Sequence, residues 1–261
     1  MIRQGIESAR RIARELSPKR WARRIFREAA LSEDGAQERR SPQPGPIETA
    51  FFGNTGRLAH KWVHYLPIYD RILAPFRGGP VTMLEIGVSE GGSLEMWRNY
   101  FGPNATICGI DINSDCATRV DSPNLVRIGS QADPAFLKSV VHEIGPPNVI
   151  LDDGSHVGEH QEASFRTLWP LLQTGGLYII EDTHTAYWAG EYRGGYRKPG
   201  TAVELVKTLI DDMHAWHHKR GEGLAPRDEL GAITVFDSIV VIEKVKRLSP
   251  GHYRIGGAKL A

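Results

Sequence analysis

The sequence has few cysteines, no excess of charge of either sign and no long apolar run. Its 261 residues include two cysteines, Cys108 and Cys116, which are too few for a disulfide framework in a chain of this length. We therefore expect a reducing, cytoplasmic setting. The 32 basic and 31 acidic residues give a net charge of +1, so nothing argues for a nucleic-acid partner and we expect none. We also expect neither a membrane span nor a secretory leader.

The basic residues are concentrated in the N-terminal part of the chain. Over residues 1–31, apolar side chains recur at helical spacing and arginines occupy the other face, which predicts one or two amphipathic helices. Such helices could pack on their own domain or on a second copy in a homo-oligomer. They could also make a peripheral membrane contact. Residues 32–48 are rich in proline, glycine and charge, so we assign 1–48 to a helical extension and linker.

From residue 81 onward, apolar strands alternate with helical segments. This alternation predicts a parallel sheet that is buried on both faces. The predicted strands are VTMLEIG, TICGIDI, NLVRIGS, NVILDDG and GGLYIIED. Near the C-terminus, ITVF and IVVIEKV are joined by Asp237-Ser238, and so short a connection requires antiparallel strands. The pattern predicts an α/β fold with a Rossmann-like, doubly wound, mostly parallel sheet and a C-terminal antiparallel hairpin, as in class I methyltransferases.

A glycine-rich turn follows the first predicted strand. It runs from Glu85 through Gly87 and Gly91 to Ser93, with the spacing G-x-x-x-G-G in place of the dinucleotide fingerprint G-x-G-x-x-G. Because a carboxylate beside the turn disfavours a pyrophosphate but tolerates a sulfonium and an amino group, Glu85 favours S-adenosylmethionine over NAD. We assign all four residues to cofactor binding.

Two further aspartates follow the next strands and complete the predicted cofactor site. Asp111 ends the second strand, where an acidic side chain accepts hydrogen bonds from ribose hydroxyls. Asp133 follows the third strand and could meet the adenine amino group. The alternative for both residues is ordinary turn and helix-capping chemistry, especially for Asp133, which precedes Pro134.

Acidic and histidine side chains are concentrated after the fourth and fifth strands. The segments are Asp152-Asp153-Gly-Ser-His156 and Glu181-Asp182-Thr-His184. The carboxyl ends of neighbouring parallel strands lie side by side, so these groups should converge at one crevice. Such a concentration of carboxylates requires a cation, and carboxylate oxygens suit Mg²⁺ or Mn²⁺. The overlapping H-x-x-E-H pattern over 156–160 also matches an inverted zinc-protease motif, but Gly158 disfavours the continuous helix that it needs.

Four motifs in this order resemble one enzyme family. E-I-G-V-x-x-G-G-S, G-I-D-I, D-D-G-S-H and I-I-E-D-T-H are similar to the metal-dependent sugar O-methyltransferases of antibiotic biosynthesis, over roughly residues 55–245. D-D-G-S-H is the most specific of them, and the Lys61-Trp62 segment resembles the helical region before the core in that family. On this basis we assign residues 49–261 to a methyltransferase domain.

The resemblance implies a role for individual residues. Asp153, Glu181 and Asp182 would bind the metal, and His156 would be the general base. Asp152, which we group with the cofactor-binding residues, would orient the site. The implied reaction is S-adenosylmethionine-dependent, Mg-assisted methylation of a vicinal-diol hydroxyl on a sugar or glycoconjugate.

Three alternatives stay open at this point. One is methylation of another diol, catechol-type or a natural product, although such enzymes typically use a lysine base. Another is a non-catalytic, cofactor-binding partner in glycan assembly, and a third is a non-methylating, iron-dependent relative of the same fold. Residues 183–200 are an aromatic, glycine-rich stretch that predicts either a lid over a sugar or a loop that is disordered or makes a dimer contact.

Overall fold

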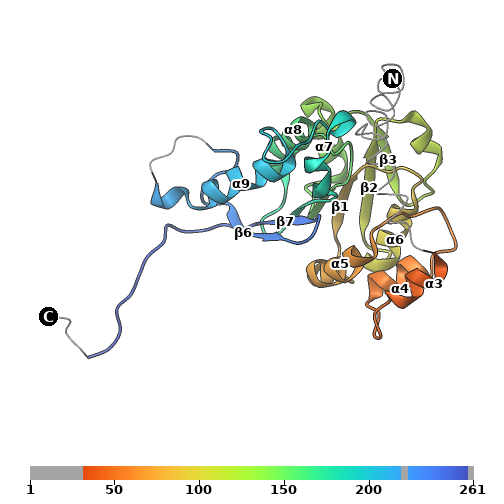
Figure 1. Cartoon of the computed structure of the whole chain (residues 1–261), viewed down its shortest axis with the longest axis horizontal. Helices are drawn as coiled ribbons and strands as arrows, with labels where there is room; N and C mark the ends of the chain where they lie inside the picture. Colours follow the sequence, from red (N-terminus) through yellow and green to blue (C-terminus); the bar gives the residue numbers. More distant parts are fainter. Residues whose placement is uncertain (1–31, 219–222, 258–261) are drawn as a thin grey trace, which may run out of the picture.

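Seven strands form one mixed sheet in the computed structural model, which describes residues 32–218 and 223–257. The strand order is β3-β2-β1-β4-β5-β7-β6, in which β1 to β5 are parallel and β7 is antiparallel to both of its neighbours (Figure 1). The strands are β1 Thr82–Ile86, β2 Thr106–Asp111, β3 Leu125–Ile128, β4 Val149–Asp152, β5 Leu177–Ile180, β6 Leu230–Val235 and β7 Val240–Lys244. This arrangement confirms the predicted α/β class and strand pattern.

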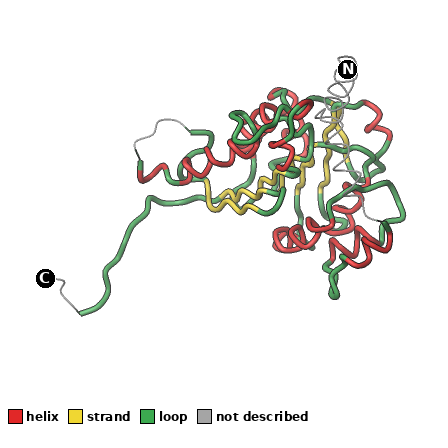
Figure 2. Tube along the Cα trace, viewed as in Figure 1, coloured by secondary structure: helices red, strands yellow, loops and turns green. Residues whose placement is uncertain are grey.

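Helices cover both faces of the sheet (Figure 2). One apolar core joins the sheet to α4, α5 and α6, and a second core joins its other face to α7, α8 and α9. The helices are α3 Glu33–Glu38, α4 Pro46–Phe52, α5 Leu66–Leu73, α6 Gly92–Phe101, α7 Pro134–Ile144, α8 Gly158–Leu168 and α9 Ala202–Met213. Because both faces are covered, the central strands are apolar along most of their length, as the sequence predicts.

The register of the parallel strands brings their carboxyl ends together. Ile86 at the end of β1 pairs with Asp152 at the end of β4, which in turn pairs with Ile180 at the end of β5. The residues that follow these strands therefore begin at one level along the same edge. This edge is where an open α/β sheet binds its ligands.

The antiparallel hairpin at the end of the sheet is also confirmed. The Phe236 amide donates to the Ile239 carbonyl at 2.8 Å across the two-residue turn Asp237-Ser238. Ser238, the second residue of this turn, has φ of 65°. Beyond β7, the chain leaves the body of the protein as an extended loop (Figure 2).

The boundary that we predicted between residues 48 and 49 falls inside α4. Ile47 is fully buried in the core beside α5, and the Asp70 carboxylate accepts from its amide at 2.9 Å. The packed domain therefore begins no later than Pro46, and the predicted linker contains α3. The basic helices predicted over 1–31, with their membrane or oligomer contact, lie outside the described residues. Within the described ranges, no helix is both long and apolar enough to cross a bilayer.

Candidate functional site

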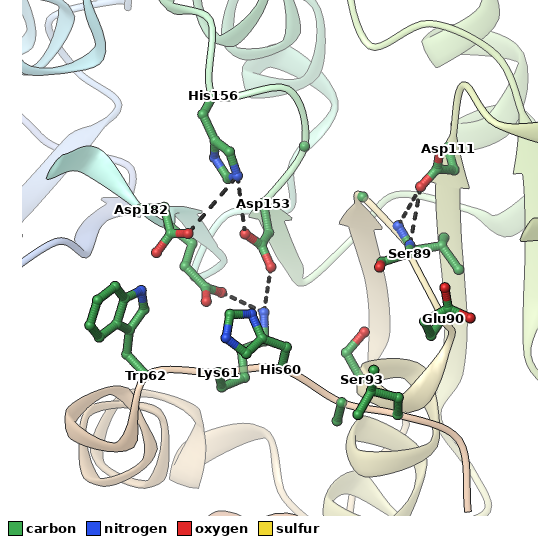
Figure 3. A pocket seen from close by; sticks show the side chains of 16 residues that line it. His60, Lys61, Trp62, Ser89, Glu90, Ser93, Asp111, Asp153, His156 and Asp182 are labelled. Carbon is green, nitrogen blue, oxygen red and sulfur yellow. Dashed lines mark hydrogen bonds and ion pairs between the residues drawn. The ribbon is translucent and has the colours of Figure 1, made fainter. Parts of the chain in front are cut away.

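A pocket of about 410 Å³ lies at the carboxyl ends of the central strands (Figure 3). Its walls come from the glycine-rich turn after β1, from the ends of β2, β4 and β5, and from the segment that precedes the 3₁₀ helix Val63–Tyr65. The lining residues are Leu58, Ala59, His60, Lys61, Trp62, Gly87, Val88, Ser89, Glu90, Ser93, Asp111, Asp153, Gly154, His156, Glu181 and Asp182. Seven of the eleven predicted site residues are therefore in one pocket.

The glycine-rich turn has the backbone geometry that its glycines predict. Gly87 and Gly91 have φ of 96° and 86°, a region that glycine enters readily. A Cβ atom on Gly87 would lie 2.2 Å from the Asp153 carbonyl oxygen, so the turn passes against the chain that leaves β4. Gly91 is the N-cap of α6 and does not line the pocket. Its contribution is to shape the turn.

We expect a Gly87→Ala variant to lose roughly 2–5 kcal/mol of folding stability, from strain at positive φ plus the clash with the backbone. Binding of S-adenosylhomocysteine should weaken as well, because the turn must move. Thermal unfolding and calorimetric titration measure the two effects. Gly78→Ala is the matched control, since Gly78 has φ of 78° but open space around its missing Cβ. If both variants lose equal stability, the close approach at Gly87 is not important.

Asp111 joins the turn to the end of β2. Its Oδ2 atom accepts from the amides of Val88 at 2.9 Å and Ser89 at 3.2 Å, and its Oδ1 atom accepts from Asn113 at 2.8 Å. Burial opposes its charge, but these backbone hydrogen bonds outweigh that effect and lower the pKa of Asp111. The carboxylate is thus ionised at the pocket wall, where it can accept further hydrogen bonds from a ligand.

Glu85 lies beneath the pocket and is fully buried. Its Oε2 atom accepts from the Ser93 hydroxyl at 2.9 Å, and its Oε1 atom is 3.9 Å from the Lys61 ammonium. Burial raises the pKa of Glu85 to about 7, although Lys61 acts in the opposite direction. Because burial and Lys61 act on its pKa in opposite directions, the protonation of Glu85 is sensitive to a charge that enters the pocket.

The metal-free stability should therefore depend on Glu85 between pH 4.5 and 7. In this window the folded chain keeps a proton that the unfolded chain has released, so stability falls as the pH rises and the loss is complete above pH 7. Glu85→Gln carries no charge at any pH and retains an acceptor for Ser93. Relative to the wild type, we expect this variant to gain on the order of 2–3 kcal/mol at pH 8 compared with pH 4.5.

Denaturant unfolding at the two pH values measures this difference. Glu90→Gln is the control, because Glu90 forms an exposed ion pair with Arg119 and such pairs contribute little. A Glu85→Gln difference that is the same at both pH values would show that the buried carboxyl does not titrate differently in the folded chain.

Besides Glu85 and Gly91, the predicted cofactor residues Asp133 and Asp152 also lie outside the pocket lining, and both perform structural roles. Asp133 is the N-cap of α7 and accepts from the amides of Ala135 and Phe136, the alternative that its sequence position suggests. Asp152 is the last residue of β4 and is fully buried on the side away from the pocket lining. Successive strand residues point to opposite faces, so Asp152 and Asp153 cannot both face the ligand.

Asp152 is surrounded by hydrogen-bond donors. Its carboxylate accepts from Ser164 Oγ at 2.6 Å, Gln131 Nε2 at 3.1 Å and the Tyr178 hydroxyl at 3.2 Å. Burial raises the pKa of Asp152, and these donors oppose that effect. The Gln131 amide oxygen accepts from the Ser155 amide at 2.7 Å, which connects this buried network to the loop that carries His156.

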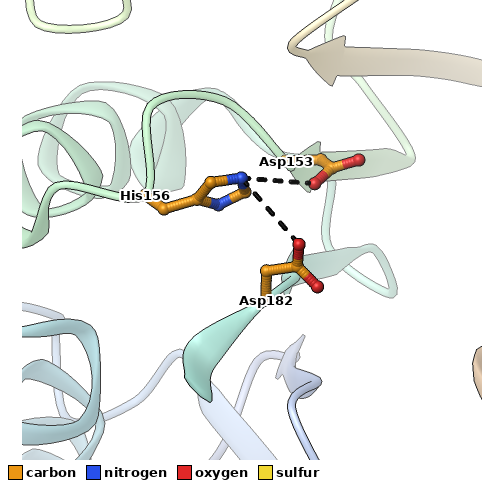
Figure 4. A group of neighbouring side chains, drawn as sticks. All are labelled: Asp153, His156 and Asp182. Atoms are coloured by element: carbon orange, nitrogen blue, oxygen red, sulfur yellow. Dashed lines mark ion pairs between the residues drawn. The ribbon is translucent and has the colours of Figure 1, made fainter. Parts of the chain in front are cut away.

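Asp153, His156 and Asp182 converge at the edge of the pocket (Figure 4). The Nε2 atom of His156 lies 3.9 Å from Asp153 Oδ1 and 4.0 Å from Asp182 Oδ2. These separations are too long for hydrogen bonds but match the roughly 4 Å between ligand atoms on opposite sides of an ion with bonds near 2.1 Å. Among the described residues, this is the group whose donor atoms fit a divalent metal ion.

Two residues of this group have unusual backbone conformations. His156 and Asp182 have φ of 56° and 55°, which non-glycine residues seldom adopt. At Asp182 this conformation turns the chain directly after Glu181, so that both carboxylates reach the pocket. Such strain persists when the surroundings enforce it, and it is concentrated at functional sites.

The third predicted metal ligand, Glu181, accepts from two donors that the sequence analysis did not assign. Lys61 Nζ lies 2.7 Å and the Tyr69 hydroxyl 2.5 Å from the Oε2 atom of Glu181, and Lys61 Nζ also lies 2.5 Å from Asp153 Oδ2. Burial, together with repulsion from Asp153, raises the pKa of Glu181. Burial disfavours the charged form of Lys61, but the carboxylates, Asp153 first, outweigh it and raise the pKa of Lys61.

Aromatic rings continue from the pocket into the loop 183–200. Trp62 contacts the ring of His184 at 5.5 Å between centroids, and His184 contacts Trp188 at 4.6 Å. Tyr192 completes the row, 5.7 Å from Trp188 and 6.1 Å from His156. The loop is ordered by two 3₁₀ helices, Thr183–Tyr187 and Gly190–Tyr192. It therefore forms a wall beside the three converging side chains.

Sequence reasoning missed the residues that surround the carboxylates. Lys61, Tyr65 and Tyr69 all donate to them, and their four-residue spacing is a signal that could have been read. The zinc-protease alternative is not supported. His160 is hydrogen-bonded to Ser155, and neither it nor Glu159 belongs to the group that fits a metal.

No family model matches the chain. The chain is 38% identical over 213 residues to the 8-demethyl-8-(2-methoxy-alpha-L-rhamnosyl)-tetracenomycin-C 3'-O-methyltransferase of Streptomyces olivaceus, covering 74% of this chain and 54% of that protein. It is 35% identical over 235 residues to the mycinamicin VI 2''-O-methyltransferase of Micromonospora griseorubida, covering 83% and 55%. The chain thus spans about half the length of the curated relatives that it matches.

A solved structure gives the same relationship. MycE methyltransferase from the mycinamycin biosynthetic pathway, in complex with Mg, SAH and mycinamycin VI, superposes with a TM-score of 0.66 and 32% identity. The match covers 79% of this chain and 55% of that one. The described core, from the glycine-rich turn to the C-terminal hairpin, has the same class of fold. The chain is therefore homologous to the deoxysugar O-methyltransferases of antibiotic biosynthesis and has the class I methyltransferase fold.

Proposed function

We propose that this chain is an S-adenosylmethionine-dependent, Mg-assisted O-methyltransferase that acts on a vicinal-diol hydroxyl of a sugar or glycoconjugate. The observation that carries the proposal is the convergence of Asp153, His156 and Asp182 at the edge of a pocket whose other wall is the glycine-rich turn. The relatives that methylate rhamnosyl groups and the neighbour in complex with Mg and SAH support it. Mn²⁺ would serve in place of Mg²⁺.

When bound, the divalent ion lowers the pKa of a chelated acceptor hydroxyl, and S-adenosylmethionine supplies the methyl group. Asp153 and Asp182, with Glu181 beside them, offer oxygen ligands to the ion. Gly87, Ser93 and Asp111 line the part of the pocket assigned to the cofactor. His156 takes the proton of the hydroxyl through Nε2, the ring nitrogen that faces the carboxylates.

The surroundings of Lys61 favour a histidine base over the lysine base that is typical of catechol-type enzymes. The Lys61 ammonium is in contact with the carboxylates of Asp153 and Glu181 at 2.5 and 2.7 Å. In these contacts all the stabilisation belongs to the protonated form, so Lys61 is poorly suited to accept a proton. His156 has no comparable ion pair, which leaves it the better base.

The row of aromatic rings offers a surface for the acceptor. Trp62 lines the pocket beside Asp182, and the rings of His184, Trp188 and Tyr192 extend it. Sugar rings pack their apolar faces on aromatic side chains, so a sugar lying there would present its hydroxyls to the carboxylates. We also propose a cytoplasmic homo-oligomer, on the basis of the sequence.

Calorimetric titration of the metal-stripped protein tests the proposal. We expect binding of S-adenosylhomocysteine, no binding of NAD, and a separate Mg²⁺ isotherm. Methyl transfer from labelled S-adenosylmethionine is then measured with rhamnosides and with catechol as acceptors. Transfer to rhamnosides supports the sugar assignment, and transfer to catechol alone refutes it. If NAD binds, or if neither nucleotide binds, the interpretation of the glycine-rich turn is wrong.

A further inference from the structure

The segment 61–69 provides hydrogen-bond donors to the three carboxylates that we assign to the metal, Asp153, Glu181 and Asp182. Lys61 precedes the 3₁₀ helix Val63–Tyr65, which continues directly into α5. Lys61, Tyr65 and Tyr69 are spaced four residues apart, and the two tyrosines lie on one face of the helical stretch. All three side chains are buried, with 7%, 0% and 0% exposure. Because buried polar groups are nearly always hydrogen-bonded, each of these donors needs an acceptor inside the protein.

Each of the three donors reaches a carboxylate more than ninety residues away in the sequence. Lys61 Nζ lies 2.5 Å from Asp153 Oδ2 and 2.7 Å from Glu181 Oε2. The hydroxyl of Tyr69 donates to Glu181 Oε2 at 2.5 Å, and that of Tyr65 donates to Asp182 Oδ1 at 2.6 Å. The segment thus fixes the three carboxylates relative to one another, and Figure 3 shows the contact between Lys61 and Asp153.

The donors leave part of each carboxylate free to face the pocket. Asp153 uses Oδ2 for Lys61 and directs Oδ1 toward His156, while Asp182 uses Oδ1 for Tyr65 and directs Oδ2 toward His156. On Glu181, both hydrogen bonds end on Oε2 and neither involves Oε1. Ligand carboxylates that are oriented by outer hydrogen bonds have this arrangement, in which one oxygen is held and the other is available.

The phenols and the ammonium must act on a bound cation in opposite ways. A phenol that donates to a carboxylate leaves its negative charge in place. It also restricts the carboxylate before an ion binds, so less conformational entropy is lost on binding. An ammonium ion at 2.5 to 2.7 Å from the same carboxylates is a positive charge within the site. It offsets their mutual repulsion, and it repels any second cation.

We propose that Lys61, Tyr65 and Tyr69 are positioning residues of the metal site, in which the two phenols favour binding of the divalent ion and the tethered ammonium of Lys61 opposes it. The inference rests on the proposed function, because it assumes that these carboxylates bind a metal. Lys61 holds the acidic site together before the ion arrives. The segment 61–69 is therefore as much a part of the metal centre as the strand ends.

Binding of Mn²⁺ to the full-length, metal-stripped protein tests this, by electron paramagnetic resonance without cofactor or acceptor. Tyr65→Phe and Tyr69→Phe each remove one oxygen and keep the ring, and each should weaken Mn²⁺ binding by about 10-fold or more. Lys61→Met should strengthen it by about 10-fold. The same Lys61→Met variant should unfold at a lower temperature than the wild type when no metal is present, because its carboxylates lose their counter-charge.

Matched controls separate this role from simple packing. Tyr100 is buried in the same apolar core as Tyr65 and Tyr69, and Lys244 is a buried lysine that donates to the Trp169 carbonyl. Tyr100→Phe and Lys244→Met should leave the Mn²⁺ affinity unchanged, whatever they do to stability. Lys61→Gln provides a second uncharged variant in case Lys61→Met does not fold.

The outcomes distinguish the two proposals. If the wild type binds no Mn²⁺, the metal site of the proposed function is wrong and this inference fails with it. If the wild type binds Mn²⁺ and all variants bind it equally, the proposed function stands, but the segment has only a packing role. If Lys61 variants bind Mn²⁺ more weakly than the wild type, the opposing role of the ammonium is wrong.

Discussion

A His156→Ala variant is expected to lose methyl transfer by about 10²–10⁴-fold in kcat, the usual contribution of a general base. Its affinity for S-adenosylhomocysteine should not change, because His156 is not part of the glycine-rich turn and directs its Nε2 atom toward Asp153 and Asp182. Added imidazole should restore part of the activity of the variant, which steady-state kinetics measures.

The same variant tests whether His156 is a base or a metal ligand, since its Nε2 atom lies about as far from Asp153 as from Asp182. For a base, Mn²⁺ affinity should stay within a few-fold of the wild type. A large loss of Mn²⁺ affinity would instead make His156 a ligand and remove it from the base role. His142→Ala, at an exposed position in the last turn of α7, is the control.

Replacing Asp182 by asparagine should weaken Mg²⁺ binding by about 100-fold or more, because a hard divalent ion loses one of its charged oxygen ligands. The metal-free fold should keep its stability. Asparagine tolerates the φ of 55° at this position, and its amide oxygen can still accept from the Tyr65 hydroxyl. Removing one of several neighbouring negative charges also reduces their repulsion.

Calorimetric titration with Mg²⁺ and thermal unfolding of the metal-free protein measure the two quantities. Asp115→Asn, at an exposed position after β2, is the control and should change neither. An Asp182→Asn variant that binds Mg²⁺ as tightly as the wild type would place the ion elsewhere. Lost stability without metal would instead mean that Asp182 is chiefly a structural residue.

The sequence was sufficient to predict the sheet and the place where chemistry is concentrated. Apolar strands separated by helices predict a buried parallel sheet, and residues that follow the ends of such strands share one edge. The glycine spacing predicted the turn at Gly87, whose φ of 96° and contact with the chain after β4 explain why glycine is required. Most of the predicted site residues follow neighbouring strands, so these local patterns were enough to predict that they lie in one pocket.

Two features could not be obtained in this way. The partners of Lys61, Tyr65 and Tyr69 lie 92 to 120 residues further along the chain, and no local pattern specifies contacts at that separation. Asp152 and Asp153 are adjacent and have identical side chains, yet Asp152 is fully buried and Asp153 lines the pocket. Strand alternation indicates that they differ, but their orientation depends on which face the following loop joins.

The buried network around Asp152 determines whether the D-D-G-S-H motif can be transferred to another protein. The loop that carries His156 is connected, through Ser155 and Gln131, to a carboxylate that is also held by Ser164 and Tyr178. These partners come from α8, β5 and the segment between β3 and α7. A five-residue graft into another doubly wound protein would therefore carry the side chains that face the pocket without the supports that shape their loop. A successful graft must include the three supporting positions, so the set of residues that has to be transferred is larger than the five-residue motif.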